Sequence, residues 1–414
     1  MYYEISGGKK LFGEVSVYGA KNAVLPLLAS SVLADAPLCI ENCRPLGDVE
    51  TMCQILRSLG VEIIWKGHKI AAYPQGLCGC EIPQFLGSKI RASVLLMGAL
   101  LGKNKVAKLP LPGGCSIGKR PIDIHLDGFA KLGAKFDCSN DLLVADGRKM
   151  HGNKVELSFP SVGATENLLL GSVLTKGETK LINCAIEPEV VQLERALMQM
   201  GAKIDGIGTS CLTIEGVDSL SGATVTAVGD RIVAATYLLA VAGAGGKVKV
   251  TGVESKHCDF LLNLLQKAGC VVSCDDGIVI ESDKLNGLGR VETAPYPGFP
   301  TDVQSLLLSL ACVCDGYTEI KEGLFENRLE HNARQLQRLG AKISVSGNVA
   351  KISGGTLSGA TVDANDLRGG AGLVLAGLFA KGITRVNNVH HVERGYFDLI
   401  GALKDLGADA RLTN

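Results

Sequence analysis

Net charge and aromatic side chains are both scarce in this chain of 414 residues. The 42 Lys and Arg residues balance the 42 Asp and Glu residues, and the sequence contains one Trp. A neutral chain with few rings lacks the basic field and the stacking platforms that nucleic-acid binding uses. Apolar runs such as "SLLLSLACVC" are shorter than a membrane span, and the N-terminus lacks the apolar segment of a signal peptide. We therefore expect a cytoplasmic protein that binds neither nucleic acid nor membrane.

Paired CxxC motifs are also absent, although the chain has 14 cysteines. The close pairs, "CGC" and "CVC", have single-residue gaps, which do not suit a zinc site. A chain of this length can bury a sufficient core without disulfides. We predict thirteen structural cysteines, with burial of the "CVC" pair, and we expect no metal and no cofactor.

One segment recurs six times. A helical stretch that ends in glycine and runs into a strand is seen in "LRSLGVEI", "FAKLGAKF", "LMQMGAKI", "LQKAGCVV", "LQRLGAKI" and "LKDLGADA". Glycine just past a helix is typical of a C-terminal turn. The six glycines are 67 to 73 residues apart: Gly60, Gly133, Gly201, Gly269, Gly340 and Gly407.

A second, more apolar helix precedes each of these segments. Stretches such as "ASVLLMGALLG" and "GGAGLVLAGLFAKG" are apolar on every side, which predicts interior helices with sheets wrapped outside them. The repeat is therefore a βαβαβ-type unit of about 70 residues, and we predict an α/β fold with two similar domains of three units each. The continuous domain is 21–228, and the split domain is 1–20 with 229–414, where the N-terminal strand completes the last unit.

One position stands in register at the start of each buried helix. Helix N-termini attract anions, because their N–H groups are unpaired and their dipole is positive. An N-cap is an equally good interpretation of Ser161, Asp230 and Asp302. Cations cannot cap a helix N-terminus, and a bound anion would relieve their conflict with the dipole. The six residues are Lys21, Arg91, Ser161, Asp230, Asp302 and Arg368.

The loops that enter the second helices add further charged and nucleophilic groups. A cationic site in a neutral chain predicts a substrate with phosphate and carboxylate groups. The chain has neither a GxxxxGK[ST] loop nor a GxGxxG fingerprint, so we expect no ordinary nucleoside triphosphate or dinucleotide site. The loop residues are Cys115, Arg120, Glu187, Glu189, Arg328, His391 and Arg394.

At these residues the chain resembles the UDP-N-acetylglucosamine 1-carboxyvinyltransferases, a family of enolpyruvyl transferases. The resemblance runs from end to end through "GAKNAVLPLLA", "KIRAS", "PGGCSIGKRPID", "FPSVGATEN", "EPEVV", "YPGFPTDVQ", "FENR" and "ERGY". It implies an inside-out α/β barrel of two domains with the active site between them. It also implies transfer of the enolpyruvyl group of phosphoenolpyruvate to the sugar 3-hydroxyl, with loss of phosphate, at the start of peptidoglycan precursor synthesis.

The resemblance also assigns roles to residues of this chain. Lys21, Arg120 and Arg394 would bind the phosphate of phosphoenolpyruvate, with Arg91 nearby, and Arg368 and Arg394 its carboxylate. The reacting sugar and the tetrahedral adduct would lie at Asn22, Asp302 and Val303. Arg328 would lie beside the diphosphate. The uridine and diphosphate would lie along Arg120, Pro121, Ile122, Asp123, Ile124, His125, Ser161, Val162 and Gly163.

Cys115 lies in a glycine-rich, cationic loop, which is not typical of core packing. As a thiol it would deliver a proton to the methylene carbon, and as a thiolate it would attack the substrate. The family favours the acid role in turnover, with the covalent adduct as a side or resting state. The same reactivity would make Cys115 the target of an epoxide such as fosfomycin.

Two departures and two alternatives remain. Val233 stands where the family more often has Glu, and Gly369 and Gly370 would loosen a helix start. The sister enzyme, 5-enolpyruvylshikimate-3-phosphate synthase, shares the six-unit fold but lacks the cysteine loop. A sugar-nucleotide sensor without catalysis is the other alternative. Because the predicted groups lie in both domains, we expect the chain to close when the nucleotide sugar binds.

Overall fold

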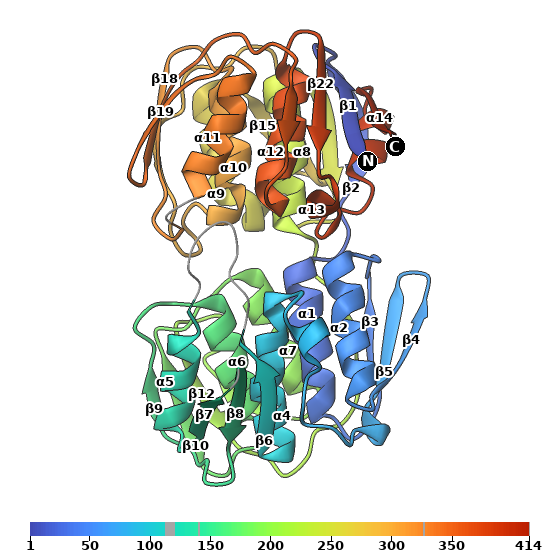
Figure 1. The fold of residues 1–414 in the computed structure, drawn as a ribbon, viewed down its shortest axis with the longest axis vertical. Coiled ribbons are helices and arrows are strands. Elements are labelled where there is room, and N and C mark those ends of the chain that lie inside the picture. The colour runs from blue at the N-terminus through green and yellow to red at the C-terminus, as the bar shows by residue number, and fades with distance from the viewer. Residues whose placement is uncertain (112–120, 140, 326–327, 414) are drawn as a thin grey trace. The chain divides into compact units, whose positions relative to one another are not determined.

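The computed structural model describes residues 1–111, 121–139, 141–325 and 328–413 (Figure 1). These residues form two compact units, which we describe separately. One unit comprises residues 18–111 with 121–228, and we call it the unit of residues 18–228. The other unit contains both termini and comprises residues 1–17 with the described part of 229–413. Within the described ranges, no helix has the length and apolar character that a membrane span requires.

In the unit of residues 18–228, three helices lie in the interior. They are α1 (Lys21–Ser30), α4 (Leu95–Asn104) and α6 (Val162–Ser172), and nearly all of their residues are buried. Further helices lie closer to the surface: α2 (Gly47–Ser58), α3 (Gln84–Gly87), α5 (Asp123–Lys131), α7 (Pro188–Gln199) and the short 3₁₀ helices η1 (Ser31–Leu33), η2 (Pro74–Gly76) and η3 (Arg91–Val94).

Three sheets surround these helices, with strand orders β13-β3-β5-β4, β6-β8-β7 and β11-β12-β10-β9. The strands are β3 (Leu38–Glu41), β4 (Glu62–Lys66), β5 (Lys69–Tyr73), β6 (Val106–Pro110), β7 (Lys135–Ser139), β8 (Leu142–Asp146), β9 (Lys154–Glu156), β10 (Glu178–Ile182), β11 (Lys203–Asp205), β12 (Cys211–Glu215) and β13 (Ala223–Thr226).

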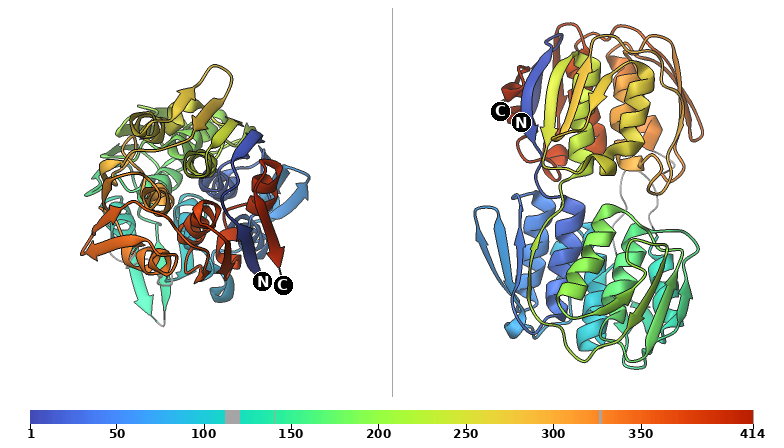
Figure 2. Two further views of the ribbon diagram at one scale, coloured as in Figure 1. Left: turned by 90° about the horizontal axis from the view of Figure 1, so that it is seen from above. Right: turned by 180° about the vertical axis from the view of Figure 1, so that it is seen from behind.

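The other unit repeats this plan. Its interior helices are α8 (Arg231–Ala244), α10 (Thr301–Ala311) and α12 (Leu367–Phe379). The remaining helices are η4 (Ser255–Cys258), α9 (Asp259–Ala268), α11 (Arg328–Arg338), α13 (His390–Glu393) and α14 (Leu399–Asp405). Figures 1 and 2 show the helices at the centre of each unit and the strands outside them.

The sheets of this unit have the orders β15-β16-β14-β2, β17-β18-β20-β19 and β21-β22-β1-β23. The strands are β1 (Tyr2–Ser6), β2 (Leu11–Ser16), β14 (Gly246–Thr251), β15 (Val271–Ser273), β16 (Ile278–Ser282), β17 (Gly289–Glu292), β18 (Tyr317–Lys321), β19 (Lys342–Ser346), β20 (Val349–Ser353), β21 (Thr361–Asp363), β22 (Ile383–Asn387) and β23 (Asp409–Thr413). The N-terminal strand β1 lies between β22 and β23 and is antiparallel to both.

The predicted inside-out arrangement is confirmed, and the repeat contains one more strand than expected. In each of the five four-stranded sheets, one parallel pair continues into two antiparallel pairings, as in β9 with β10, β12 and β11. The added strand arises because, in five of the six repeats, the strand after the glycine turn folds back as a hairpin, whereas in the last repeat this strand pairs with the N-terminal strand β1. The glycine turns themselves are confirmed: the six repeat glycines have φ between 89° and 116°, in the left-handed region that glycine favours.

Candidate anion-binding and active site

The unit that contains both termini brings Asp302, Arg328 and Arg368 together at the starts of three helices. Asp302 lies in the first turn of α10, Arg328 begins α11, and Arg368 is the second residue of α12. The Nη2 atom of Arg328 is 3.2 Å from Asp302 Oδ1, and that of Arg368 is 3.9 Å from Asp302 Oδ2. Both guanidinium side chains are 4% exposed, whereas the Asp302 side chain is 32% exposed. The carboxylate is therefore the accessible member of the cluster.

Neighbouring groups hold the two arginines in place. Arg328 donates two hydrogen bonds from Nη1 to Thr301, at 2.8 Å to the carbonyl oxygen and 2.7 Å to Oγ1. The Arg368 guanidinium lies 5.4 Å from the centroid of the Tyr396 ring, and the Tyr396 hydroxyl lies 2.8 Å from Thr236 Oγ1. Because Thr236 belongs to α8, this network joins all three interior helices of the unit.

Arg368 is a buried cation with donor capacity to spare. Burial lowers its pKa, but Tyr396 and the carboxylates of Asp302 and Asp230 more than offset this effect, so the pKa is raised and the side chain stays charged. Among the described residues, its Nη1 atom has no hydrogen-bond partner. A buried N–H donor without a partner is costly unless a ligand oxygen accepts from it. The arrangement suits an anion.

Two of the three expected N-caps are confirmed. Ser161 Oγ accepts from the Ala164 N–H at 3.4 Å, and Asp230 Oδ1 accepts from two backbone N–H groups of α8. The cap interpretation of Asp302 is wrong, because the N-cap of α10 is Pro300 and makes no side-chain cap bond. As a residue within the helix, Asp302 directs its carboxylate to Arg328 and Arg368 instead.

In the other unit, Lys21 at the start of α1 has a partner that the sequence analysis missed. Its Nζ atom is 3.0 Å from Oδ2 of Asp48, in the first turn of α2, and the two side chains are 10% and 11% exposed. The sequence analysis expects a bound anion to relieve the conflict between Lys21 and the helix dipole. In the structure, the carboxylate of Asp48 offsets this conflict instead. The signal was the acidic first turn of the neighbouring helix in "PLGDVE". Asn22, the next residue, is half-buried.

The segments expected to hold the nucleotide form two contacts in this unit. Arg91, at the start of η3, donates from Nη2 to the carbonyl oxygen of Pro121 at 3.0 Å. His125 of α5 lies beside Gly163 at the start of α6. Among the other predicted residues, Ile122 is buried, Pro121 and Asp123 are exposed, and Ile124, Ser161, Val162 and Gly163 are half-buried.

Other predicted residues lie apart from these contacts or outside the described part. Arg394 follows α13 and is half-buried, whereas Val303 is fully buried in α10. Cys115 and Arg120 lie outside the described residues. Of the cysteines within them, Cys312 and Cys314 are buried as predicted, but Cys78, Cys138 and Cys274 are exposed.

The glycines after Arg368 make room for neighbouring side chains. A Cβ on Gly369 would lie 2.2 Å from Asn332 Oδ1, and one on Gly370 would lie 2.6 Å from Val392 Cγ2. The start of α12 is capped by Asp366, which accepts from the N–H groups of Arg368 and Gly369. Val233 is likewise buried in a capped helix start, since its N–H donates to Asp230 at 3.1 Å.

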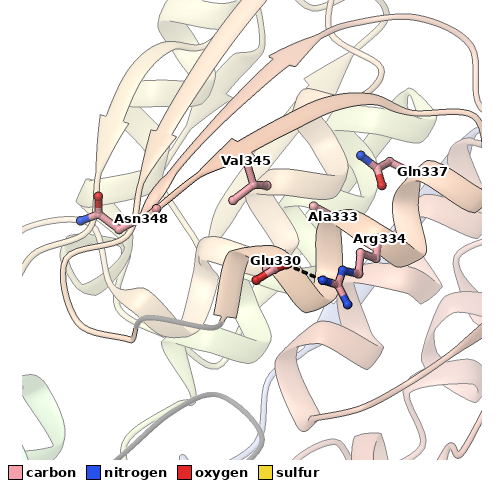
Figure 3. A pocket seen from close by; sticks show the side chains of 7 residues that line it. Glu330, Ala333, Arg334, Gln337, Val345 and Asn348 are labelled. Carbon is pink, nitrogen blue, oxygen red and sulfur yellow. Dashed lines mark hydrogen bonds and ion pairs between the residues drawn. The ribbon is translucent and has the colours of Figure 1, made fainter.

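A pocket of about 570 Å³ lies elsewhere on the same unit, between α11 and the hairpin of β19 and β20 (Figure 3). Glu330 and Arg334 form an ion pair at 2.5 Å along its helical side. None of the predicted site residues lines this pocket, so it is not part of the candidate site. The lining residues are Glu330, Ala333, Arg334, Gln337, Val345, Gly347 and Asn348.

The fold has repeats with interior helices, and helix starts in one unit carry buried arginines beside an accessible carboxylate. This arrangement suits an α/β protein that binds a small anion. Comparison with known proteins identifies the family. The chain belongs to the EPSP synthase (3-phosphoshikimate 1-carboxyvinyltransferase) family, whose sequence model matches residues 5–403.

Within this family, the chain is similar over nearly its whole length to curated enzymes. It is 42% identical over 410 residues to UDP-N-acetylglucosamine 1-carboxyvinyltransferase 2 of Caldanaerobacter subterraneus subsp. tengcongensis, covering 98% of each chain. It is 44% identical over 411 residues to UDP-N-acetylglucosamine 1-carboxyvinyltransferase of Endomicrobium trichonymphae, covering 99% of this chain and 98% of the relative.

Solved structures share the fold. The enolpyruvyl transferase NikO from Streptomyces tendae has a TM-score of 0.88 at 27% identity, covering 99% of this chain and 98% of its own. EPSP synthase from Acinetobacter baumannii has a TM-score of 0.79 at 17% identity, with both chains fully covered, and supports the fold alone.

Proposed function

We propose that this enzyme transfers the enolpyruvyl group of phosphoenolpyruvate to the 3-hydroxyl of UDP-N-acetylglucosamine and releases phosphate, the first committed step of peptidoglycan precursor synthesis. The observation that carries this proposal is the 42% to 44% identity, over at least 98% of the chain, to enzymes of that name. We also propose that the reaction takes place in the cytoplasm.

In this proposal, Asp302 acts on the sugar hydroxyl. Its carboxylate is accessible, and the buried Arg328 and Arg368 fix its orientation. Asp302 accepts the hydroxyl proton as the C–O bond forms, or orients the hydroxyl for attack, and Asn22 supports the sugar. The free Nη1 donor of Arg368 supports binding of the phosphoenolpyruvate carboxylate, together with Arg394.

The phosphate of phosphoenolpyruvate is assigned to Lys21, Arg120 and Arg394, with Arg91 nearby. Cys115 delivers the proton to the methylene carbon during addition. Loss of a proton from the new methyl group and loss of phosphate from the tetrahedral adduct then restore the carbon–carbon double bond, which gives the enol ether of the sugar. The uridine and diphosphate are assigned to the residues from Arg120 to His125 and from Ser161 to Gly163, with Arg328 on the diphosphate side.

Phosphate release with two alternative acceptors tests the assignment. The purified protein with phosphoenolpyruvate should release phosphate when UDP-N-acetylglucosamine is added, and not when shikimate 3-phosphate is added. Release with shikimate 3-phosphate alone would overturn the proposal in favour of the sister enzyme. Binding of the nucleotide sugar without phosphate release would favour the non-catalytic sensor.

A further inference from the structure

Asn167 is a fully buried amide at the centre of a hydrogen-bond relay in the unit of residues 18–228. It lies on α6, five residues after the helix begins, and none of its surface is exposed. Its Oδ1 atom accepts from the Gly98 N–H of α4 at 2.7 Å, and its Nδ2 atom donates to the Val94 carbonyl at 3.0 Å. The same Nδ2 atom lies 2.9 Å from Nδ1 of His125.

The backbone partners determine which way the amide faces. A backbone N–H can only donate, so the atom facing Gly98 must be the oxygen. A carbonyl can only accept, so the atom facing Val94 must be the nitrogen. The second hydrogen of Nδ2 then remains for His125, and Nδ1 of His125 must be the acceptor. The imidazole is therefore neutral and carries its proton on Nε2.

The Nε2 edge of His125 faces the start of α6. An ideal Cβ on Gly163 would lie 3.4 Å from Cε1 and 3.6 Å from Nε2 of His125, which are ordinary contact distances. Within the described ranges, Nε2 has no hydrogen-bond partner, and His125 keeps 7% of its surface exposed. One N–H donor thus remains unused beside Gly163.

The neutral state of His125 has independent support. Burial lowers its pKa to about 4, with Arg91 adding to this effect and Asp123 opposing it. A proton added to Nδ1 would also place an N–H against the Asn167 N–H. His125 is consequently suited to donate one hydrogen bond from Nε2, and unsuited to act as a cation.

We propose that Asn167 is a positioning residue, which holds His125 as a neutral Nε2–H donor to an acceptor oxygen of the bound nucleotide sugar. The identity of the ligand rests on the proposed function, because Gly163 lies in the segment assigned to the nucleotide. The tautomer of His125 does not depend on that assignment. In this proposal, the Gly98 N–H of α4 fixes the orientation of the Asn167 amide, and the amide in turn fixes the His125 tautomer that contacts the ligand.

Nitrogen NMR of the imidazole rings tests the tautomer directly. In the unliganded protein, His125 should show a pyridine-like Nδ1 and a pyrrole-like Nε2, with the signals assigned by their loss in His125→Gln. The Asn167→Asp variant places a carboxylate against Nδ1, so the neutral ring should carry its proton on Nδ1 and lose the N–H donor at Nε2. The matched control is Asn263→Asp, at an exposed site on α9. A pyrrole-like Nδ1 in the parent protein would overturn the relay.

Kinetics test the role in binding. Loss of one neutral hydrogen bond predicts that Asn167→Asp raises the KM for UDP-N-acetylglucosamine about fivefold to tenfold. The KM for phosphoenolpyruvate and kcat should stay within about twofold, as in Asn263→Asp. His125→Phe should reproduce the loss, and His125→Gln, which keeps a donor at the distance of Nε2, should recover part of it. If Asn167→Asp does not fold, the two His125 variants test the binding role. The same KM for UDP-N-acetylglucosamine in His125→Phe and His125→Gln would overturn the proposed hydrogen bond from His125. A correct tautomer in a protein that does not bind the nucleotide sugar would instead refute the proposed function.

Discussion

At the scale of residues, Asp302 is notable because its carboxylate is accessible while both of its arginine partners are buried. Two fixed cations stabilise the charged carboxylate and hold it at one orientation. Such a group can accept a proton only in concert with bond formation, or can align a hydroxyl for attack. Either role requires the oxygens of Asp302 rather than its charge alone.

Replacing Asp302 with Asn should therefore lower kcat on the order of a hundredfold or more, because the amide cannot accept the hydroxyl proton in the same way. Equilibrium binding of UDP-N-acetylglucosamine, measured by calorimetry, should stay close to that of the parent. The control is Asp127→Asn, at an exposed position on α5. A near-normal kcat in Asp302→Asn would remove this residue from the chemistry.

Cys115 carries a prediction about chemistry. Cys115→Asp keeps a proton donor, so it should retain activity and lose sensitivity to fosfomycin, whereas Cys115→Ala should lose most turnover. Mass spectrometry of the alkylated parent should locate the label on Cys115, with the exposed Cys78, Cys138 and Cys274 as internal controls. Full activity of the Ala variant, or labelling at another cysteine, would refute this role.

Glu194 carries a prediction about pH. Burial raises the pKa of this α7 carboxyl to about 7, although Oε2 accepts a 2.8 Å hydrogen bond from the Gly208 N–H. Between the usual pKa and pH 7 the folded state holds a proton that the unfolded chain has lost, so stability falls as pH rises through this window. In Glu194→Gln this fall should disappear.

Urea unfolding at pH 5 and pH 8 measures the effect. From pH 5 to pH 8, the free energy of unfolding of the parent should fall by on the order of 2 kcal/mol more than that of the Gln variant. Glu178→Gln, at an exposed position on β10, is the control and should follow the parent curve. Parallel curves for Glu194→Gln and the parent would mean that Glu194 does not titrate with a raised pKa.

At the scale of elements, the interior helices approach each other at glycines. A Cβ on Gly372 of α12 would lie 2.7 Å from the Ser305 carbonyl oxygen of α10, and one on Gly98 of α4 would lie 2.1 Å from the Asn167 carbonyl oxygen of α6. Both units thus pack two of their three interior helices backbone against backbone. This close contact brings the helix starts, and the charged residues on them, near one another.

Gly372→Ala should force α10 and α12 apart and reduce the free energy of unfolding by roughly 1–3 kcal/mol. It should also lower kcat/KM, because Asp302 and Arg368 lie on these two helices. Gly355→Ala is the matched control, since a Cβ there would meet nothing within 4 Å. Equal unfolding midpoints for the two variants would contradict the close contact.

The sequence predicts an element well where its pattern of residues is compatible with only one local structure. The six repeat glycines all take positive φ, and the apolar helices are all interior, because few alternatives suit either pattern. The fourth strand of the five four-stranded sheets was not predicted, because a short added strand has no such signature. Likewise, Lys21, Asp302 and Arg368 follow from the helix starts, but Asp48 and Tyr396 do not, since their roles depend on contacts between helices distant in sequence.

At the scale of the whole molecule, one βαβαββ plan accounts for both units. Five sheets share the same strand pattern, and β1 completes the sheet that contains the last strand of the chain. The repeated plan presents a helix start with a charged or capping residue six times, from Lys21 to Arg368. The proposed function of the protein is enolpyruvyl transfer to UDP-N-acetylglucosamine.

Carbon NMR of the product formed from labelled phosphoenolpyruvate and UDP-N-acetylglucosamine tests whether the protein catalyses this transfer. We expect one enol ether on the sugar 3-hydroxyl for each phosphate released, and at least about a hundredfold less of this ether from Asp302→Asn over the same time. Phosphate release with pyruvate as the carbon product, or an enol ether formed only on shikimate 3-phosphate, would contradict the proposed function.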